Sequence, residues 1–236
     1  MSIAENFARV REQIENAARR AGRNPNEVTL VAVSKTFPPE AILEAHAAGA
    51  RELGENRVEE ASEKITAVNR ALGAQKPRWH LIGHLQRRKT RDAVKVFDVI
   101  QSVDSLRLAE TIHRAAGDLS KQMPILLQVN VGNDPNKFGF DLNARGAFLR
   151  EVEKIVGLKH VRVEGLMTIG PLVSTADEAR PFFRDLRILR DALRQNFPNA
   201  RWDELSMGMT DDYAVAIEEG ATIVRIGRAI FGQRNA

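Results

Sequence analysis

The sequence contains no cysteine among its 236 residues. This excludes a disulfide framework, a thiol nucleophile and a thiolate metal site. It also has no apolar run near the ~20 residues that a membrane-spanning helix needs. The N-terminus has neither the basic segment nor the continuous apolar segment of a signal peptide. We therefore expect a soluble, cytoplasmic protein that does not engage a membrane.

An excess of one charge is also missing. The chain has 35 basic and 31 acidic residues, for a formal net charge of +4, and the two signs are interspersed. Such a mild charge is compatible with a small anionic ligand. The one dense basic run, residues 87–91, has no aromatic residue within it, which favours a solvated helix face. We therefore expect no nucleic acid partner, and we keep a protein- or nucleic-acid-binding module built on this run as an alternative hypothesis.

What the sequence does contain is a regular alternation of strand and helix patterns. Apolar, strand-like segments occur at residues 28–36, 51–54, 78–83, 97–102, 124–131, 161–167, 203–206 and 222–226. A helical pattern follows each of them. One extra helix, within residues 1–22, comes first and opens on a capping box formed by Ser2 and Glu5. Eight β/α units in about 230 residues are typical of a (β/α)8 TIM barrel.

The alternative to a closed barrel is an open, doubly wound sheet. No G-x-G-x-x-G motif follows the first strand, which disfavours that alternative. No linker or low-complexity segment divides the chain. We therefore predict an α/β fold in which residues 1–236 form a single TIM-barrel domain, with the N-terminal helix packed on the barrel.

The first strand ends on a lysine, Lys35, which lies between Ser34 and Thr36. In barrels of this kind the active site lies at the C-terminal ends of the strands. A lysine there can be partly desolvated and close to other cations, which lowers the pKa of its amine and makes it nucleophilic toward an aldehyde. Taken alone, a lysine after a strand is usually solvated, and that interpretation is favoured until other residues are considered.

The segments after the seventh and eighth strands have the features of a phosphate site. Residues Ser206–Thr210 combine two hydroxyl groups with Gly208 just before a helix, and Gly227 opens a second helix. Glycine lets a ligand approach the backbone, and the N–H groups at a helix start suit phosphate. Taken alone, these residues favour ordinary caps and turns over a phosphate site.

Two other features are expected to be structural. Asp104 is a good N-cap for the helix after the fourth strand. His80 and His84 have the i, i+4 spacing of a metal pair, but they fall on a strand and a loop, and H-E-x-x-H is absent. A structural or pocket-lining role is therefore favoured over a metal site.

Taken together, these motifs resemble those of the YggS/PROSC family of pyridoxal 5′-phosphate (PLP) homeostasis proteins. The resemblance covers residues 28 to 233. It rests on Ala32-Val-Ser-Lys-Thr36, Gly54-Glu-Asn56, Trp79-His-Leu-Ile-Gly-His-Leu-Gln86, Gln128-Val-Asn130, Gly165-Leu-Met-Thr-Ile169, Leu205-Ser-Met-Gly-Met-Thr-Asp-Asp212, Val224-Arg-Ile-Gly227 and Ala229-Ile-Phe-Gly232.

The resemblance implies a fold-type III PLP barrel, similar to the N-terminal domain of alanine racemase. Lys35 matches the lysine that forms the covalent aldimine with PLP, and Arg225 matches the arginine that faces the pyridine nitrogen. Asn56 and Met167 match residues that line the ring pocket. The positions that match the phosphate-binding residues are Ser206, Gly208, Thr210 and Gly227.

The chain departs from the common pattern of this family at a few positions. Arg57 replaces a tyrosine, Phe37 a lysine, and Arg228 a threonine or serine, whereas Thr210 replaces a serine and keeps the hydroxyl. Arg228 either removes a hydroxyl from the phosphate site or adds a cation to it. Lys137, after the fifth strand, matches a lysine common in the family, and we expect it to assist PLP entry or exit.

The family resemblance leaves a choice between a carrier and an enzyme. An amino-acid racemase needs an acid/base on each face of the substrate carbanion. Alanine racemases supply one with a tyrosine and carry a second domain; this chain has one tyrosine, Tyr213, and no room for that domain. An arginine at the pyridine nitrogen opposes its protonation. We therefore expect a monomeric, non-catalytic carrier that binds PLP through Lys35 and passes it to apo-enzymes. A PLP-dependent racemase or related fold-type III enzyme is the alternative.

Overall fold

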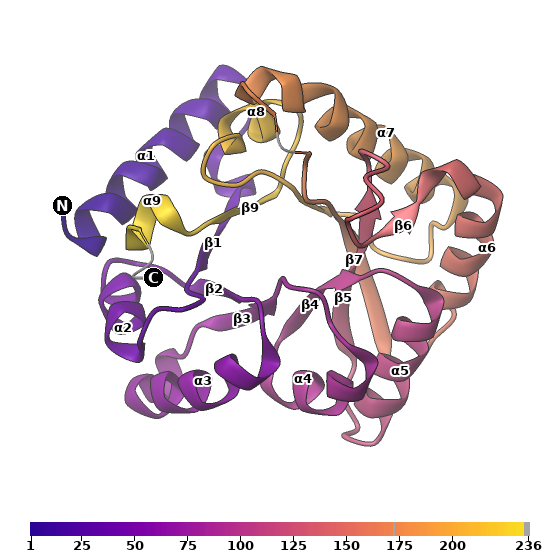
Figure 1. Ribbon diagram of the computed structural model, residues 1–236, viewed down its shortest axis with the longest axis horizontal. Helices are drawn as coiled ribbons and strands as arrows, with labels where there is room; N and C mark the ends of the chain where they lie inside the picture. The colour runs from indigo at the N-terminus through magenta and orange to yellow at the C-terminus, as the bar shows by residue number, and fades with distance from the viewer. Residues whose placement is uncertain (172, 234–236) are drawn as a thin grey trace.

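The computed structural model describes residues 1–171 and 173–233, and its centre is a closed parallel barrel (Figure 1). The strands follow the order β4-β3-β2-β1-β9-β8-β7-β5, and pairing between β4 and β5 closes the ring. The strands are β1 Thr29–Val33, β2 Glu52–Glu55, β3 Arg78–Leu81, β4 Val99–Val103, β5 Met123–Asn130, β6 Phe140–Asp141, β7 Val161–Met167, β8 Glu204–Ser206 and β9 Ile223–Ile226.

Helices surround this barrel in a ring (Figure 1). They are α1 Ile3–Arg20, α2 Pro39–Ala47, α3 Val58–Leu72, α4 Thr90–Val96, α5 Leu106–Gly117, α6 Arg145–Val156, α7 Arg180–Asn196, α8 Tyr213–Glu218 and α9 Arg228–Phe231. The prediction of a (β/α)8 barrel is confirmed, and the open-sheet alternative is wrong because β4 pairs with β5. The sequence did not predict β6, a two-residue strand that pairs with the end of β5.

The N-terminal helix α1 begins as predicted. The Ser2 side chain accepts a hydrogen bond from the Glu5 backbone, and the Glu5 carboxylate accepts one from the Ser2 backbone. The buried face of α1, which includes Phe7, Val10 and Ile14, packs on the barrel beside α8 and α9. This helix therefore covers the side of the barrel where β9 and β1 meet, as Figure 1 shows.

Side chains on β1 alternate between the two sides of the barrel wall. Leu30 and Ala32 belong to the large core under the helices, whereas Val31 belongs to a separate apolar cluster inside the barrel, with Leu126, Met167 and Ile223. The ladder continues past the strand, because the Ser34 N–H donates to the Gly54 carbonyl. Lys35 follows in the turn directly after Ser34.

The helix α5 corrects one expectation. Its N-cap is Ser105, whose side-chain oxygen accepts a hydrogen bond from the Leu108 backbone, and not Asp104. The Asp104 carboxylate instead lies 3.2 Å from Nδ1 of His84, on the loop after β3. Because Asp104 contacts His84 on a neighbouring loop, the adjacent Ser105 caps the helix instead.

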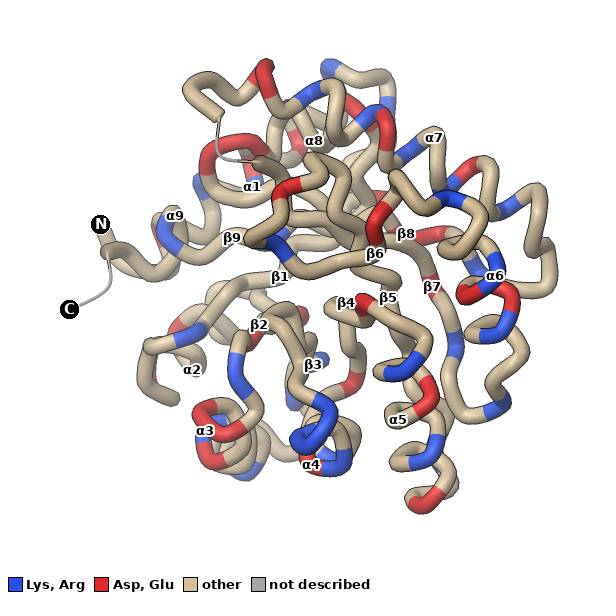
Figure 2. Tube along the Cα trace, turned by 45° about the vertical axis from the view of Figure 1, so that its right-hand side comes forward, with Lys and Arg blue, Asp and Glu red and all other residues tan. Residues whose placement is uncertain are grey.

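Charged residues of both signs lie interspersed along the outer helices, as Figure 2 shows. Within residues 1–171 and 173–233, no helix is long and apolar enough to cross a membrane.

Candidate functional site

The predicted site residues all follow or end five neighbouring strands of the barrel. The strands β2, β1, β9, β8 and β7 are consecutive in the ring, and the site residues lie toward their C-terminal ends. In that order they are Asn56, Lys35, Arg225 with Gly227, Ser206 with Gly208 and Thr210, and Met167. The structure therefore gathers on one side of the barrel mouth residues that are far apart in the sequence.

Backbone contacts join the ends of β1, β9 and β8 closely. The Arg225 N–H donates to the Gly208 carbonyl at 3.0 Å. Gly227 lies against the end of β1, where an added Cβ atom would lie 3.2 Å from the Val33 carbonyl oxygen. Lys35 follows Val33 by two residues. The predicted amine and the two glycine loops therefore come from adjacent stretches of chain.

Gly208 has a conformation and surroundings that only glycine fits. Its φ angle is +92°, a left-handed value. A Cβ atom there would lie 2.6 Å from Cβ of Ala216 and 2.9 Å from Cα of Tyr213. A side chain would force the loop away from α8. The loop that carries Thr210 is therefore pressed directly onto this helix.

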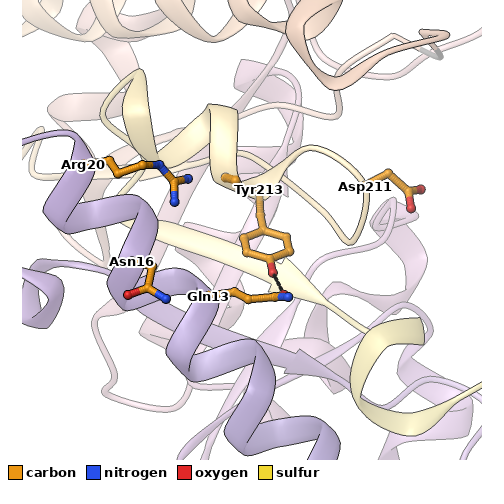
Figure 3. Close-up of a pocket in the computed structure, with 6 residues that line it drawn as sticks. Gln13, Asn16, Arg20, Asp211 and Tyr213 are labelled. Atoms are coloured by element: carbon orange, nitrogen blue, oxygen red, sulfur yellow. Dashed lines mark hydrogen bonds between the residues drawn. The ribbon is translucent and has the colours of Figure 1, made fainter.

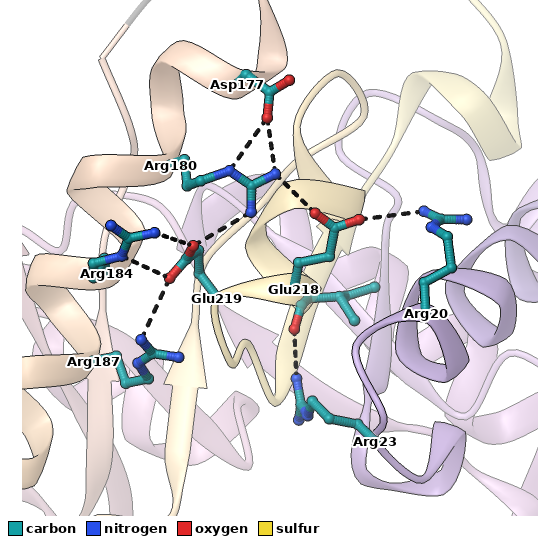
Figure 4. Close-up of polar contacts among 9 residues, drawn as sticks. Arg20, Arg23, Asp177, Arg180, Arg184, Arg187, Glu218 and Glu219 are labelled. Carbon is teal, nitrogen blue, oxygen red and sulfur yellow. Dashed lines mark hydrogen bonds and ion pairs between the residues drawn. The ribbon is translucent and has the colours of Figure 1, made fainter.

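Ion pairs outside the barrel fix α8 in turn (Figure 4). The Glu219 carboxylate, which is buried, lies within 3.0–3.5 Å of Arg180, Arg184 and Arg187 on α7. The Arg184 hydrogen bond is the largest of the effects that hold the pKa of Glu219 below its usual value. Glu218 adds a contact to Arg180 at 2.8 Å. This cluster anchors the helix that supports the Gly208 loop.

Arg225 is the most deeply placed cation of the site. It is only 4% exposed. One guanidinium nitrogen donates to Oγ of Ser206 at 2.6 Å, and another donates to the Thr168 carbonyl at 2.7 Å. Burial lowers the pKa of Arg225 to about 10, and the charge of Asp212 opposes that shift. The guanidinium therefore stays charged at neutral pH.

Two of the predicted site residues, Ser206 and Met167, are fully buried. The Ser206 hydroxyl is fully buried, accepts a hydrogen bond from Arg225 and donates one to Oε1 of Gln101 at 2.6 Å. Its phosphate role stays a prediction, whereas its contact with Arg225 is part of the structure. Met167 belongs to the apolar cluster inside the barrel, with Val31 and Ile223, below the C-terminal ends of the strands.

The backbone around Lys35 is tightly held. Lys35 itself is half-buried, and the next residue, Thr36, has a φ angle of +70°. A β-branched residue rarely adopts this conformation, and the surroundings must maintain it. The Thr36 N–H donates to the Glu60 carboxylate at 2.6 Å, and Nζ of Lys64 donates to the Ser34 carbonyl at 3.1 Å.

Both of these contacts belong to one buried ionic cluster beneath α3. The amine of Lys64 also donates to the carboxylates of Glu55, at 3.0 Å, and Glu60, at 3.1 Å, and the Ser34 hydroxyl donates to Glu55 at 2.7 Å. Glu55 is fully buried, and its other carboxylate oxygen has no hydrogen-bond partner within the described residues. Burial raises the pKa of Glu55, although Ser34 and Lys64 act in the opposite direction.

Asn56 lies beside an open groove of about 690 Å³ between the start of α3 and the loop after β3. Arg57, Arg88 and Lys89 line this groove, and Lys89 forms an ion pair with Glu59. The predicted basic run therefore borders the mouth. It begins as a 3-10 turn before α4 and is not one continuous helix face.

Lys137 lies on the loop after β5 and is held there. Its Nζ donates to the Gly170 carbonyl at 2.8 Å and lies 3.8 Å from the Asp134 carboxylate. The neighbouring Phe138 ring, which is 54% exposed, stacks on the ring of His84 with centroids 3.6 Å apart. This stack bridges the loops after β3 and β5.

His80 and His84 do not face a common point. His80 is buried inside the barrel and contacts Gln101 and Glu52, whereas His84 contacts Asp104 on the outer loops. The described part of the chain contains no group of three or more His, Cys, Asp or Glu side chains that could hold a metal ion.

A separate cavity of about 340 Å³ lies outside the barrel, between α1 and the start of α8 (Figure 3). Tyr213 points into the space beside α1, and its hydroxyl donates to Oε1 of Gln13 at 2.5 Å. Arg20 and Asp211 lie at its edges. Asp211 also pairs with Arg228, so the arginine that departs from the family pattern ties the start of α9 to the loop before α8.

Comparison with known proteins agrees with this architecture. The family model for the alanine racemase N-terminal domain matches residues 6–235. A pyridoxal phosphate homeostasis protein of Aquifex aeolicus is 41% identical over 99% of this chain and 99% of its own length. One of Escherichia coli K12 is 39% identical over 99% of this chain and 97% of its own length.

Solved structures give the same picture. PipY of Synechococcus elongatus with PLP bound is 42% identical, with a TM-score of 0.85 over 98% of this chain and 100% of that chain. An alanine racemase of Clostridium difficile in complex with cycloserine is 14% identical, with a TM-score of 0.73 over 96% of this chain and 60% of that chain, which shows a shared fold. The chain therefore belongs to the family of pyridoxal phosphate homeostasis proteins, whose fold is that of the alanine racemase N-terminal domain.

Proposed function

We propose that this chain binds PLP reversibly as a Schiff base on Lys35, buffers or delivers it, and catalyses no reaction of its own. The observation that carries the proposal is the position of two cations. Lys35 lies in the turn directly after β1, and the buried Arg225 lies on the adjacent strand β9, on the same inner face as Ile223. One supplies an amine for an aldehyde, and the other a charged donor for the acceptor nitrogen of a heterocyclic ring.

The remaining predicted residues fit a phosphate group on the same side of the mouth. The loops after β8 and β9 carry Gly208, where a side chain would clash with α8, and Gly227, where a Cβ atom would lie 3.2 Å from the Val33 carbonyl oxygen. Thr210 adds a half-buried hydroxyl. When bound, PLP supplies an electrophilic aldehyde and an electron-withdrawing ring. This chain would hold the phosphate, fix the ring nitrogen against Arg225 and shield Lys35 from water.

The position of the single tyrosine favours a carrier over a racemase. The Tyr213 hydroxyl donates to Gln13 of α1, outside the barrel wall, and the residue is only 8% exposed. It is therefore not placed to act as a second acid/base across the mouth from Lys35. The names of the relatives, homeostasis proteins, support the same conclusion.

Two assays test this proposal. Purified protein is titrated with PLP, and the Lys35→Ala variant serves as the control; we expect a visible absorbance band in the wild type only. The loaded protein is then incubated with single L-amino acids and monitored for D-enantiomers. Turnover of order 1 s⁻¹, within the usual enzyme range, would refute a non-catalytic role.

Delivery needs a separate experiment. The PLP-loaded protein is mixed with an apo PLP-dependent enzyme in the presence of a phosphatase that destroys free PLP. Delivery predicts that enzyme activity returns more fully with the loaded protein than with the same total concentration of free PLP. If enzyme activity recovers equally from both sources, the delivery part of the proposal is wrong and only storage of PLP remains.

A further inference from the structure

The inside of the barrel contains buried polar side chains where barrels of this kind usually carry bulky apolar ones. Their exposed fractions are 2% for His80, 0% for Gln101, 0% for Ser206 and 4% for Arg225. They come from β3, β4, β8 and β9. Burying a polar group is unfavourable unless it is hydrogen-bonded, so the contacts of these residues reveal their purpose.

The four residues form one continuous chain of hydrogen bonds that ends on Glu52. Arg225 contacts Ser206 at 2.6 Å, and Ser206 contacts Oε1 of Gln101 at 2.6 Å. Nε2 of Gln101 lies 2.8 Å from Nδ1 of His80, and Nε2 of His80 lies 2.5 Å from the Glu52 carboxylate. Glu52 begins β2, so the chain runs from the mouth to the opposite end of the barrel.

The direction of every bond in this chain follows from chemistry. A guanidinium can only donate, so the Ser206 oxygen accepts and its single proton goes to Gln101. The amide must therefore present its oxygen to Ser206 and its NH2 group to His80. Nδ1 of a neutral His80 then accepts, and the ring proton lies on Nε2, facing Glu52. All the bonds point from a cation to an anion, an arrangement in which each bond polarises and strengthens the next.

We propose that Gln101 is a positioning residue for the cofactor site: through Ser206 it sets the orientation in which the Arg225 guanidinium meets the ring nitrogen of a bound pyridine-type ligand. Gln101 lies on β4, on the far side of the barrel from the glycine loops, and is fully buried. Only the contact between Arg225 and the ligand rests on the proposed function. The series of hydrogen bonds from Arg225 to Glu52 is independent of that function.

The first test uses ligand-free protein. Nitrogen-15 NMR of the His80 ring should show the neutral tautomer with the proton on Nε2 and a hydrogen-bonded Nδ1. In Gln101→Leu the Nδ1 signal should move to the position of a nitrogen without a hydrogen bond. A wild-type ring protonated on Nδ1 would refute the proposed series of hydrogen bonds, whether or not PLP binds. An Nδ1 signal that Gln101→Leu leaves unchanged would refute it as well.

The second test measures the dissociation constant and absorbance maximum of PLP in Gln101→Leu, Ser206→Ala and the double variant. Each single change should weaken PLP binding about tenfold and shift the absorbance band, which is the scale of one lost hydrogen bond to a charged group. The double variant should bind no more weakly than the weaker single variant, because both changes break one chain. Independent, additive losses, or single variants that bind PLP as the wild type does, would contradict the positioning role.

Two further variants separate positioning from packing. Gln101→Glu keeps an acceptor for Ser206 but removes the NH2 group that faces His80, so PLP binding should return toward the wild-type value while the His80 signal stays altered. The control Gln122→Leu changes an exposed glutamine just before β5, and it should alter neither PLP binding nor the His80 signal. If Gln101→Glu binds PLP as weakly as Gln101→Leu, the proposal is wrong. Failure of the wild type to bind PLP would refute the proposed function and leave the NMR test standing.

Discussion

The replacement of Lys64 by methionine tests what holds the backbone on either side of Lys35 in place. The Lys64 amine has three acceptors at 3.0–3.1 Å, namely the Ser34 carbonyl and the carboxylates of Glu55 and Glu60, and the residue is 8% exposed. Methionine fills similar space and removes the charge. Glu55 would then remain fully buried without its cation. Breaking a buried pair in this way destabilises a protein by about 3–5 kcal/mol.

That loss can be expressed as a melting temperature. For a domain of this length, each kcal/mol shifts Tm by about 2–4 °C, so Lys64→Met should lower Tm by roughly 6–20 °C at pH 7. The matched control is Lys89→Met, because Lys89 pairs with Glu59 on the surface of the same helix, α3. An exposed pair contributes little, and the control should retain nearly the wild-type Tm.

The loss of stability in Lys64→Met should depend on pH, and the direction of that dependence tests the role of Glu55. Burial already raises the pKa of Glu55, and removal of Lys64 takes away one of the partners that oppose the shift. A carboxyl group whose folded pKa is raised binds a proton more readily in the folded state, so its stability is lost as pH rises through that pKa. The deficit of Lys64→Met should therefore be smallest below the ordinary glutamate pKa of about 4.3 and largest at neutral pH. Thermal unfolding between pH 4 and 8 measures this; a deficit independent of pH, or one equal to that of Lys89→Met, would refute the reasoning.

Three other changes have definite expected outcomes. Lys137→Ala should alter the rates of PLP uptake and release in stopped-flow absorbance, and unchanged rates would remove Lys137 from the entry path. Tyr213→Phe should lower the free energy of unfolding by about 1 kcal/mol through the lost bond to Gln13 and leave PLP affinity intact; weakened PLP binding would contradict its place outside the barrel. Glu219→Gln should lower Tm at pH 7, and the difference should shrink in acid as pH falls through the depressed pKa of Glu219; a difference that grows in acid would be inconsistent with the cluster.

The barrel and the location of the site could be predicted because they follow from local patterns. Strand and helix periodicity, with glycine at the helix ends, fixed the order of the elements, and the C-terminal ends of strands are where such barrels place their chemistry. Lys35, Gly208 and Gly227 could be placed in this way. The choice between Asp104 and Ser105 as helix cap could not, because it depends on His84 of another loop.

The supporting contacts were harder to foresee because they join distant segments. Lys64 lies on a helix face that is otherwise apolar, and its partner Glu55 belongs to the preceding strand. Neither residue looks unusual until the backbone brings them together. The hydrogen-bonded chain inside the barrel did leave a partial signal, because His80 is a polar residue between Trp79 and Leu81 in a buried strand. Gln101 follows Ile100 but precedes Ser102, so its strand shows the pattern less clearly. Their hydrogen-bonded partners still required the structure.

The central claim is that Lys35 is the amine that holds PLP. The measurement that tests it most directly is reduction of the PLP-loaded protein with borohydride, followed by mass spectrometry of its peptides. The account predicts a single modified peptide with the label on Lys35, and loss of the visible absorbance band on reduction. A label on Lys64 or Lys137 instead, or no label at all after incubation with PLP, would contradict it.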